Sequence, residues 1–144
     1  MSSYILRIAV VTPILFWASY TDFKRHRIEN KASASIFICG ILILLWAKWD
    51  ISPQEVFVSA VIVAALGLVL YMFGQGAGDG KLFTSLAIIF GFRVFFVMGG
   101  AYFVAGIFAA ILRLLKLVDS ESKLPLAPAI SCVAILFLIL TYAS

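Results

Sequence analysis

Two carboxylates beside apolar segments are the side chains of this sequence best placed to do chemistry. Asp79 ends the glycine-rich stretch Gly76-Ala77-Gly78-Asp79, which lies between two apolar segments. Asp22 stands at the end of an earlier apolar segment. An acidic side chain in hydrocarbon costs about 2.5–3.5 kcal/mol on insertion scales, so a carboxylate at a membrane segment marks a candidate functional site. When two carboxylates share a site, one keeps its proton because like charges repel. The ionised one can activate water while the other protonates a carbonyl, which is aspartic protease chemistry.

Both aspartates also have simpler interpretations, which the sequence leaves open. Asp79 is placed to be the N-cap of a helix that begins at Gly80, and Asp22 to neutralise the basic loop after it. Within a catalytic pair, a helix amino terminus favours Asp79 as the base. The other five acids are expected in surface roles: Glu29, Asp50, Glu55, Asp119 and Glu121.

The glycines around Asp79 are interpreted as a substrate cradle. Gly76, Gly78 and Gly80 allow positive φ values and the close approach of another chain. Irregular backbone in a membrane is tolerated only where it is buried in protein or lines a watery cavity. An extended substrate can hydrogen-bond to such backbone as an added strand. Other glycines are expected to allow close helix packing: Gly67, Gly99, Gly100 and Gly106.

The composition indicates that this chain lies in a membrane rather than in water. Its 144 residues are 64% hydrophobic and 12% charged, with a mean hydropathy of +1.13. A soluble domain of this size cannot bury so much apolar surface. The apolar runs are continuous rather than alternating, which excludes a membrane barrel. The sequence therefore predicts an all-α polytopic membrane helix bundle, formed as one domain over residues 1–144.

The hydropathy pattern predicts about six transmembrane helices, one of them short. The stretch from 82 to 115 is too long for a single crossing, and Gly91-Phe92-Arg93 is favoured over Gly99-Gly100 as its turn because it keeps Arg93 at a polar boundary. Ser52 is expected to cap the third helix. The predicted segments are 4–20, 34–49, 55–73, 82–90, 94–115 and 126–142.

Basic residues orient the predicted helices. With the amino terminus outside, eight of the eleven lysines and arginines face the cytoplasm, as the positive-inside rule requires. Asp22 and Asp79 then share the cytoplasmic side. The net charge of +4 fits contact with an anionic lipid bilayer and gives no reason to expect nucleic acid. Cys39 and Cys132 are isolated, so we expect no metal and no cofactor.

Three stretches resemble the type IV prepilin peptidases, which are aspartic proteases of the GxGD class. The first, from Asp22 to Asn30, is similar to the motif of an Asp followed by basic residues and Ile-Pro-Asn. The second, Gly76 to Leu82, is similar to GxGDxKL. The third, Pro125 to Ile130, resembles the Pro-x-x-Pro entry to the last helix. The resemblance covers nearly the whole chain, and it implies that Asp22 and Asp79 are the catalytic pair.

The resemblance also implies a substrate and a location. The short chain is similar to the tight-adherence (TadV/CpaA-like) branch, whose substrates resemble Flp-type pilins and pseudopilins with a short basic leader. It implies leader cleavage at the cytoplasmic face of the inner membrane. Glu29 stands where the family usually has proline, and the paired CxxC motifs associated with methylation of the new amino terminus are missing. We therefore expect peptidase activity without methylation.

Two other functions fit parts of the pattern. Presenilin-like GxGD proteases pair this motif with Tyr-Asp on the preceding helix, whereas Tyr20-Thr21-Asp22 lies farther upstream and lacks that adjacency. A small transporter or assembly scaffold is the non-enzymatic alternative. It would need acids near the bilayer midplane, while these two lie at helix ends.

Overall fold

The fold is an all-helical bundle, as predicted. The structure is a computed structural model and describes residues 3–25, 30–46, 51–116 and 126–143. In these ranges it has no strand, and its elements are α1 (Ser3–Arg25), α2 (Asn30–Trp46), α3 (Pro53–Met72), α4 (Ala77–Phe90), the 3-10 turn η1 (Gly91–Arg93), α5 (Val94–Leu114) and α6 (Ala127–Ala143). The expectations for Glu29, Asp50, Asp119, Glu121 and Pro125 fall outside the described residues.

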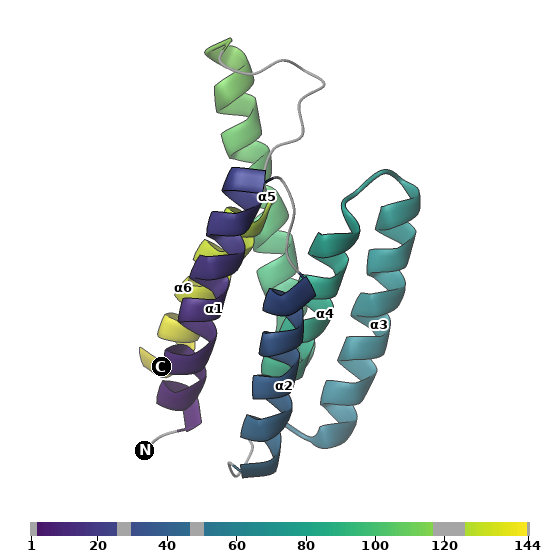
Figure 1. The fold of residues 1–144 in the computed structure, drawn as a ribbon, viewed down its shortest axis with the longest axis vertical. Coiled ribbons are helices and arrows are strands. Elements are labelled where there is room, and N and C mark those ends of the chain that lie inside the picture. The colour runs from purple at the N-terminus through teal and green to yellow at the C-terminus, as the bar shows by residue number, and fades with distance from the viewer. Residues whose placement is uncertain (1–2, 26–29, 47–50, 117–125, 144) are drawn as a thin grey trace.

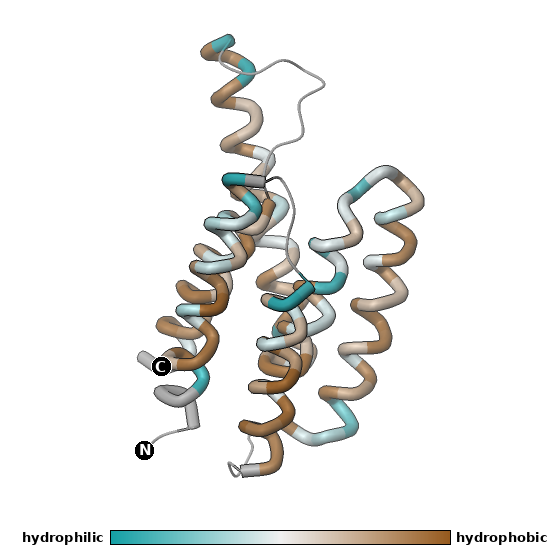
Figure 2. Tube along the Cα trace, in the orientation of Figure 1, coloured by the Kyte–Doolittle hydropathy of each residue, from teal (hydrophilic) through white to brown (hydrophobic). Residues whose placement is uncertain are grey.

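Successive helices run in alternating directions (Figure 1). The carboxyl ends of α1, α3 and α5 and the amino ends of α2, α4 and α6 therefore point toward one end of the bundle, which we call the motif end. Polar residues concentrate near helix ends, and apolar residues cover the lengths between them (Figure 2). The described residues of all three motif stretches lie at the motif end, because each stretch adjoins the amino end of α2, α4 or α6.

The fourth predicted segment is a helix, but it begins earlier than expected. α4 starts at Ala77 rather than Leu82, and the chain reverses at η1 as predicted. Gly91 has φ +55, and a Cβ there would lie 2.6 Å from Glu55 Oε1. That oxygen accepts a hydrogen bond of 3.2 Å from the Phe92 amide. Glu55 thus lies in the first turn of α3 and contacts the turn through a solvent-exposed hydrogen bond, in addition to the surface role expected for it.

α4 lies at the centre of the packing. It contacts α2, α3 and α5, while α6 contacts α1 and α5. Gly67 of α3 and Gly80 of α4 bring these two backbones together, because a Cβ on Gly80 would lie 3.2 Å from the Gly67 Cα. Gly100 also packs closely, against Val133, whereas Gly99 and Gly106 meet no atom within 4 Å. The packing role expected for Gly99 and Gly106 is therefore wrong.

Two described stretches are long and apolar enough to cross a bilayer: Pro53–Met72, and Ala77–Leu114, which joins α4, η1 and α5. The apolar stretches Asn30–Leu45 and Ala127–Thr141 are shorter. At 1.5 Å per residue, α4 is about 21 Å long and α5 about 31 Å, so α4 is the short helix that the sequence predicted. Ser52 caps α3 by accepting a 3.1 Å hydrogen bond from the Glu55 amide, also as predicted.

Candidate active site

Asp22 lies near the carboxyl end of α1 and is only 6% exposed. Its Oδ2 accepts a hydrogen bond of 3.0 Å from the amide of Ala127, the first residue of α6. The first N–H groups of a helix have no partner within that helix. The carboxylate of Asp22 therefore caps α6 from another helix, and this contact joins the first motif to the third.

A polar seam between α1 and α6 supports the contact of Asp22. Ser19 Oγ donates to Ser131 Oγ at 2.6 Å, and Ser131 Oγ donates to the Leu15 carbonyl at 3.0 Å. Ser19 lies about one turn before Asp22 in α1, and Ser131 lies about one turn after Ala127 in α6. Hydrogen bonds between helices in an apolar surrounding fix their relative rotation. The seam thus holds Asp22 against the amino end of α6.

Asp79 lies in the first turn of α4 and is partly buried. The N-cap of this helix is Gly76, whose carbonyl accepts a 3.2 Å hydrogen bond from the Asp79 amide. The alternative in which Asp79 caps a helix that begins at Gly80 is therefore wrong. The carboxylate is instead carried on a helical turn, which leaves its side chain available for other contacts.

The glycines of the second motif adopt ordinary backbone angles. Gly76 has φ −64, and the positive φ values in the described residues occur at Gly74, Gly91 and Lys116. The expectation of positive φ at Gly76, Gly78 and Gly80 is therefore wrong. Gly80 is required by its packing on α3. At Gly76 a Cβ would lie 3.4 Å from Asp79 Oδ2, so this glycine leaves space next to the carboxylate.

The structure brings the two aspartates together. The carboxylates of Asp22 and Asp79 lie close enough for their negative charges to interact. A second contact joins the same motifs, because Lys81 Nζ donates to Asn30 Oδ1 at 3.0 Å across 51 residues of sequence. Asn30 begins α2 and Lys81 follows Asp79 by two residues in α4. Both motifs thus meet at the motif end, where the hydrogen bond between Lys81 and Asn30 joins them.

Sequence reasoning missed two polar side chains beside Asp79. Gln75 directly precedes the second motif, and its side chain lies near the Asp79 carboxylate. Gln75 Nε2 also donates to the hydroxyl of Tyr102 on α5. The position of Gln75 next to the GxGD motif could have indicated that its side chain lies near Asp79. Nothing in the sequence indicates that Tyr102 contacts Gln75.

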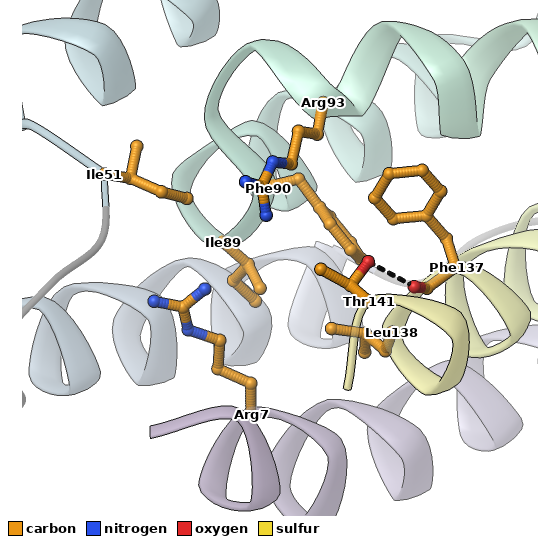
Figure 3. A pocket seen from close by; sticks show the side chains of 8 residues that line it. All are labelled: Arg7, Ile51, Ile89, Phe90, Arg93, Phe137, Leu138 and Thr141. Atoms are coloured by element: carbon orange, nitrogen blue, oxygen red, sulfur yellow. Dashed lines mark hydrogen bonds between the residues drawn. The ribbon is translucent and has the colours of Figure 1, made fainter. Parts of the chain in front are cut away.

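A pocket with two arginines lies far from the aspartates. Arg7 and Arg93 extend toward it from α1 and η1, and the Thr141 hydroxyl donates to the Phe137 carbonyl on its other side (Figure 3). Arg7 precedes Asp22 by 15 residues of α1, or about 22 Å. This pocket therefore lies at the opposite end of the bundle. In the described segments no three His, Cys, Asp or Glu side chains gather as a metal site would require.

Comparison with known proteins agrees with the motifs. Neither the curated proteins nor the solved structures contain a match. The family model of the type IV leader peptidases matches residues 9–140, a range that includes Asp22, Asp79 and Ala127. Because this match covers most of the 144 residues, the chain belongs to the type IV leader peptidase family.

Proposed function

We propose that this chain is an aspartic endopeptidase that removes the leader peptides of Flp-like type IV prepilins, with Asp22 and Asp79 as its catalytic pair. Membership of the leader peptidase family supports the class of reaction. The observation that carries the choice of residues is that Asp22 of α1 and Asp79 of α4 lie at the same end of the bundle, near enough to interact electrostatically. They come from separate motifs and from different helices, and they meet at one end of the bundle.

The pair performs the reaction by sharing one proton. The ionised carboxylate takes a proton from water as the water oxygen attacks the scissile carbonyl carbon, and the protonated carboxyl gives its proton to the carbonyl oxygen. The resulting gem-diol then loses a proton to one carboxylate, while the other carboxyl protonates the departing nitrogen. The C–N bond breaks, and the pair again holds one proton.

Both carboxylates lie at helix amino termini. Asp22 accepts the first amide of α6, and Asp79 stands in the first turn of α4. Helix amino termini favour negative charge, so this effect acts on both members of the pair. The preference for Asp79 as the base rested on this effect alone, so the effect no longer distinguishes Asp79 from Asp22. The proton belongs to the pair rather than to one residue.

The glycines take different parts in this proposal. Gly76 is exposed and adjoins the Asp79 carboxylate, so it is the best placed of the three to contact a substrate backbone. Gly78 is partly buried in the first turn of α4. Gly80 contributes by bringing α4 against α3, which places the whole motif. Substrate contact is thus assigned to Gly76 and Gly78, with Gly80 as their support.

The position of the two aspartates supports the proposed substrate and location. The motif end is proposed to face the cytoplasm at the inner membrane, because eight of the eleven lysines and arginines fall on this side in the topology predicted from the sequence. A prepilin would present its basic leader at this face and its hydrophobic helix alongside the bundle in the lipid. Cleavage at their junction requires a carboxylate pair at a helix end, which is where Asp22 and Asp79 lie.

Coexpression with a tagged Flp-like prepilin tests the function. We expect the chain to shorten the prepilin, and sequencing of the mature amino terminus to place the cut at the end of the basic leader. An unprocessed prepilin in membranes that contain the correctly inserted chain would contradict the proposal. In that case the transporter or scaffold alternative would account for the two acids.

A further inference from the structure

The backbone before Asp79 is fixed by the end of α3. Gly74 has φ +92, its amide donates to the Tyr71 carbonyl at 3.0 Å, and the Gln75 amide donates to the Leu70 carbonyl at 3.1 Å. This pair of bonds with a left-handed glycine is a Schellman motif. The motif uses only the backbone of Gln75. The side chain of Gln75 is therefore not needed to end the helix, and its role must come from its own contacts.

The Gln75 side chain lies between Asp79 and Tyr102. Its amide nitrogen has two hydrogens, one of which goes to the Tyr102 hydroxyl. The side chain also lies near the Asp79 carboxylate, four residues along the chain, so the amide stands between the two groups. Gln75 and Asp79 are both partly buried. An amide held by Tyr102 and partly enclosed has few rotamers available, and it restricts the carboxylate beside it.

Tyr102 is itself held in place. Its ring lies 5.8 Å from the ring of Phe83, with an interplanar angle of 33°, and Phe83 is a buried residue of α4. Packing against Phe83 holds Tyr102 of α5 against α4, the helix that carries Asp79. The charge of Asp79 also acts on Tyr102, as expected if the two side chains lie close together. The chain of contacts thus runs from α5 through the loop to α4.

We propose that Gln75 and Tyr102 are positioning residues for the catalytic pair: Tyr102 fixes the Gln75 amide, and this amide fixes the Asp79 carboxylate in the orientation in which it shares a proton with Asp22. The proposal rests on the function proposed above. It gives a role to a loop side chain and to a residue of α5, a helix that none of the three motifs includes.

Two substitutions separate this role from packing. Tyr102→Phe keeps the ring against Phe83 and removes only the hydroxyl, and Gln75→Leu keeps the approximate volume and removes the amide. We expect Gln75→Leu to lower kcat about tenfold, because it removes the amide beside a carboxylate, and Tyr102→Phe to lower kcat about threefold to tenfold, the effect of losing one neutral hydrogen bond. KM should change less than twofold in each. The controls are Tyr71→Phe and Gln54→Leu, which alter exposed residues of α3 and should retain the wild-type kcat.

The double variant gives the sharper test. If Tyr102 acts through Gln75, Gln75→Leu with Tyr102→Phe should be no slower than Gln75→Leu alone, with the melting temperatures of all three in detergent close to the wild type. The proposal would be overturned by a wild-type kcat in Tyr102→Phe. It would also be overturned if the losses multiply in the double variant, or if the loss of kcat follows a fall in melting temperature. Asp22→Asn and Asp79→Asn are measured in the same assay. If the wild-type chain leaves prepilin uncut, the proposed function fails; if it cuts normally and Gln75→Leu does too, only the positioning role fails.

Discussion

Asp22 Oδ2 accepts a 3.0 Å hydrogen bond from the Ala127 amide, which joins residues separated by 105 positions of sequence. The bond is buried, because Asp22 is 6% exposed and Ala127 is fully enclosed. It explains how the third motif, which has no acid or base of its own, can belong to the proposed catalytic site. The entry to α6 supplies a donor that orients one of the two carboxylates.

Removing this donor should slow catalysis. Ala127→Pro deletes the amide hydrogen at the first position of α6, where proline is otherwise well accepted. Because a hydrogen bond to a charged group contributes about 1.5–3 kcal/mol, we expect kcat for prepilin cleavage to fall about 10- to 100-fold. Ala127→Val is the matched control, since it adds a similar volume to the same buried site and retains the N–H. Equal kcat values for the proline and valine variants would show that the donor is not used.

Neutralising either aspartate should abolish leader removal. In Asp22→Asn and Asp79→Asn, the amide can neither take the proton of water nor share the proton of the pair. General acid–base catalysis contributes about 10²–10⁴-fold, so processing should fall by at least about a hundredfold. Immunoblots of coexpressed tagged prepilin, with membrane fractions checked for the peptidase, measure this. Asp119→Asn is the control and should process normally; a variant of Asp22 or Asp79 that does so refutes the catalytic pair.

The hydrogen bond between Asn30 and Lys81 should make the two residues act as a unit. Both side chains are exposed, so solvent weakens their interaction to at most about 1 kcal/mol, or about fivefold in rate. We expect Asn30→Ala, Lys81→Met and the double variant to show the same modest loss of kcat/KM. The control Lys31→Met changes an exposed lysine beside Asn30 and should be silent. Losses that multiply in the double variant would mean that the two residues work independently.

The contact of Gly80 with Gly67 predicts a loss of stability. A Cβ on Gly80 would lie 3.2 Å from backbone of α3, so Gly80→Ala must push α3 and α4 apart. Overpacking of this kind costs about 1–3 kcal/mol, which thermal unfolding in detergent can measure. Gly99→Ala is the control, because no atom lies within 4 Å of its new Cβ and alanine is the better helix former. Equal melting temperatures for the two variants would be inconsistent with this packing.

The alternation of the helices predicts which residues share a membrane face. In a background free of Cys39 and Cys132, Lys31→Cys should react with impermeant thiol reagents only after the inner face is exposed. Gln54→Cys, at the other end of the bundle, should be labelled in intact cells. Both residues are exposed at helix amino ends, which makes them comparable probes. Labelling of both from the same side would contradict the alternation between α2 and α3.

The sequence was sufficient to predict the helices but not their neighbours. Continuous apolar runs predicted six helical segments, and the charge of Arg93 located the turn at η1. Lipid-facing and protein-facing sides are both apolar in a membrane helix, so periodicity does not show which face meets another helix. For this reason the contact of Asp22 with Ala127 and that of Gln75 with Tyr102 could not be foreseen.

The glycines show a second limit of the sequence. A glycine-rich motif suggested unusual backbone angles at Gly76, Gly78 and Gly80, but the left-handed residue is Gly74, where α3 ends. Helix α4 then begins at Ala77 and extends through the motif. Glycine is used either for its backbone angle or for its small size, and the sequence alone does not distinguish them. Gly80, which serves close packing, is an example of the second use.

The seam of Ser19 and Ser131 bears on how the protein is made. α1 is synthesised well before α6, yet the two helices pack together, and their hydroxyls satisfy one another. Until α6 has been made, the Asp22 carboxylate lacks the Ala127 amide, and Ser19 has the Leu15 carbonyl of its own helix as a partner. The pairing of α1 with α6 is therefore completed only when the last helix has been made, and a chain truncated before α6 keeps an uncapped carboxylate in its first helix.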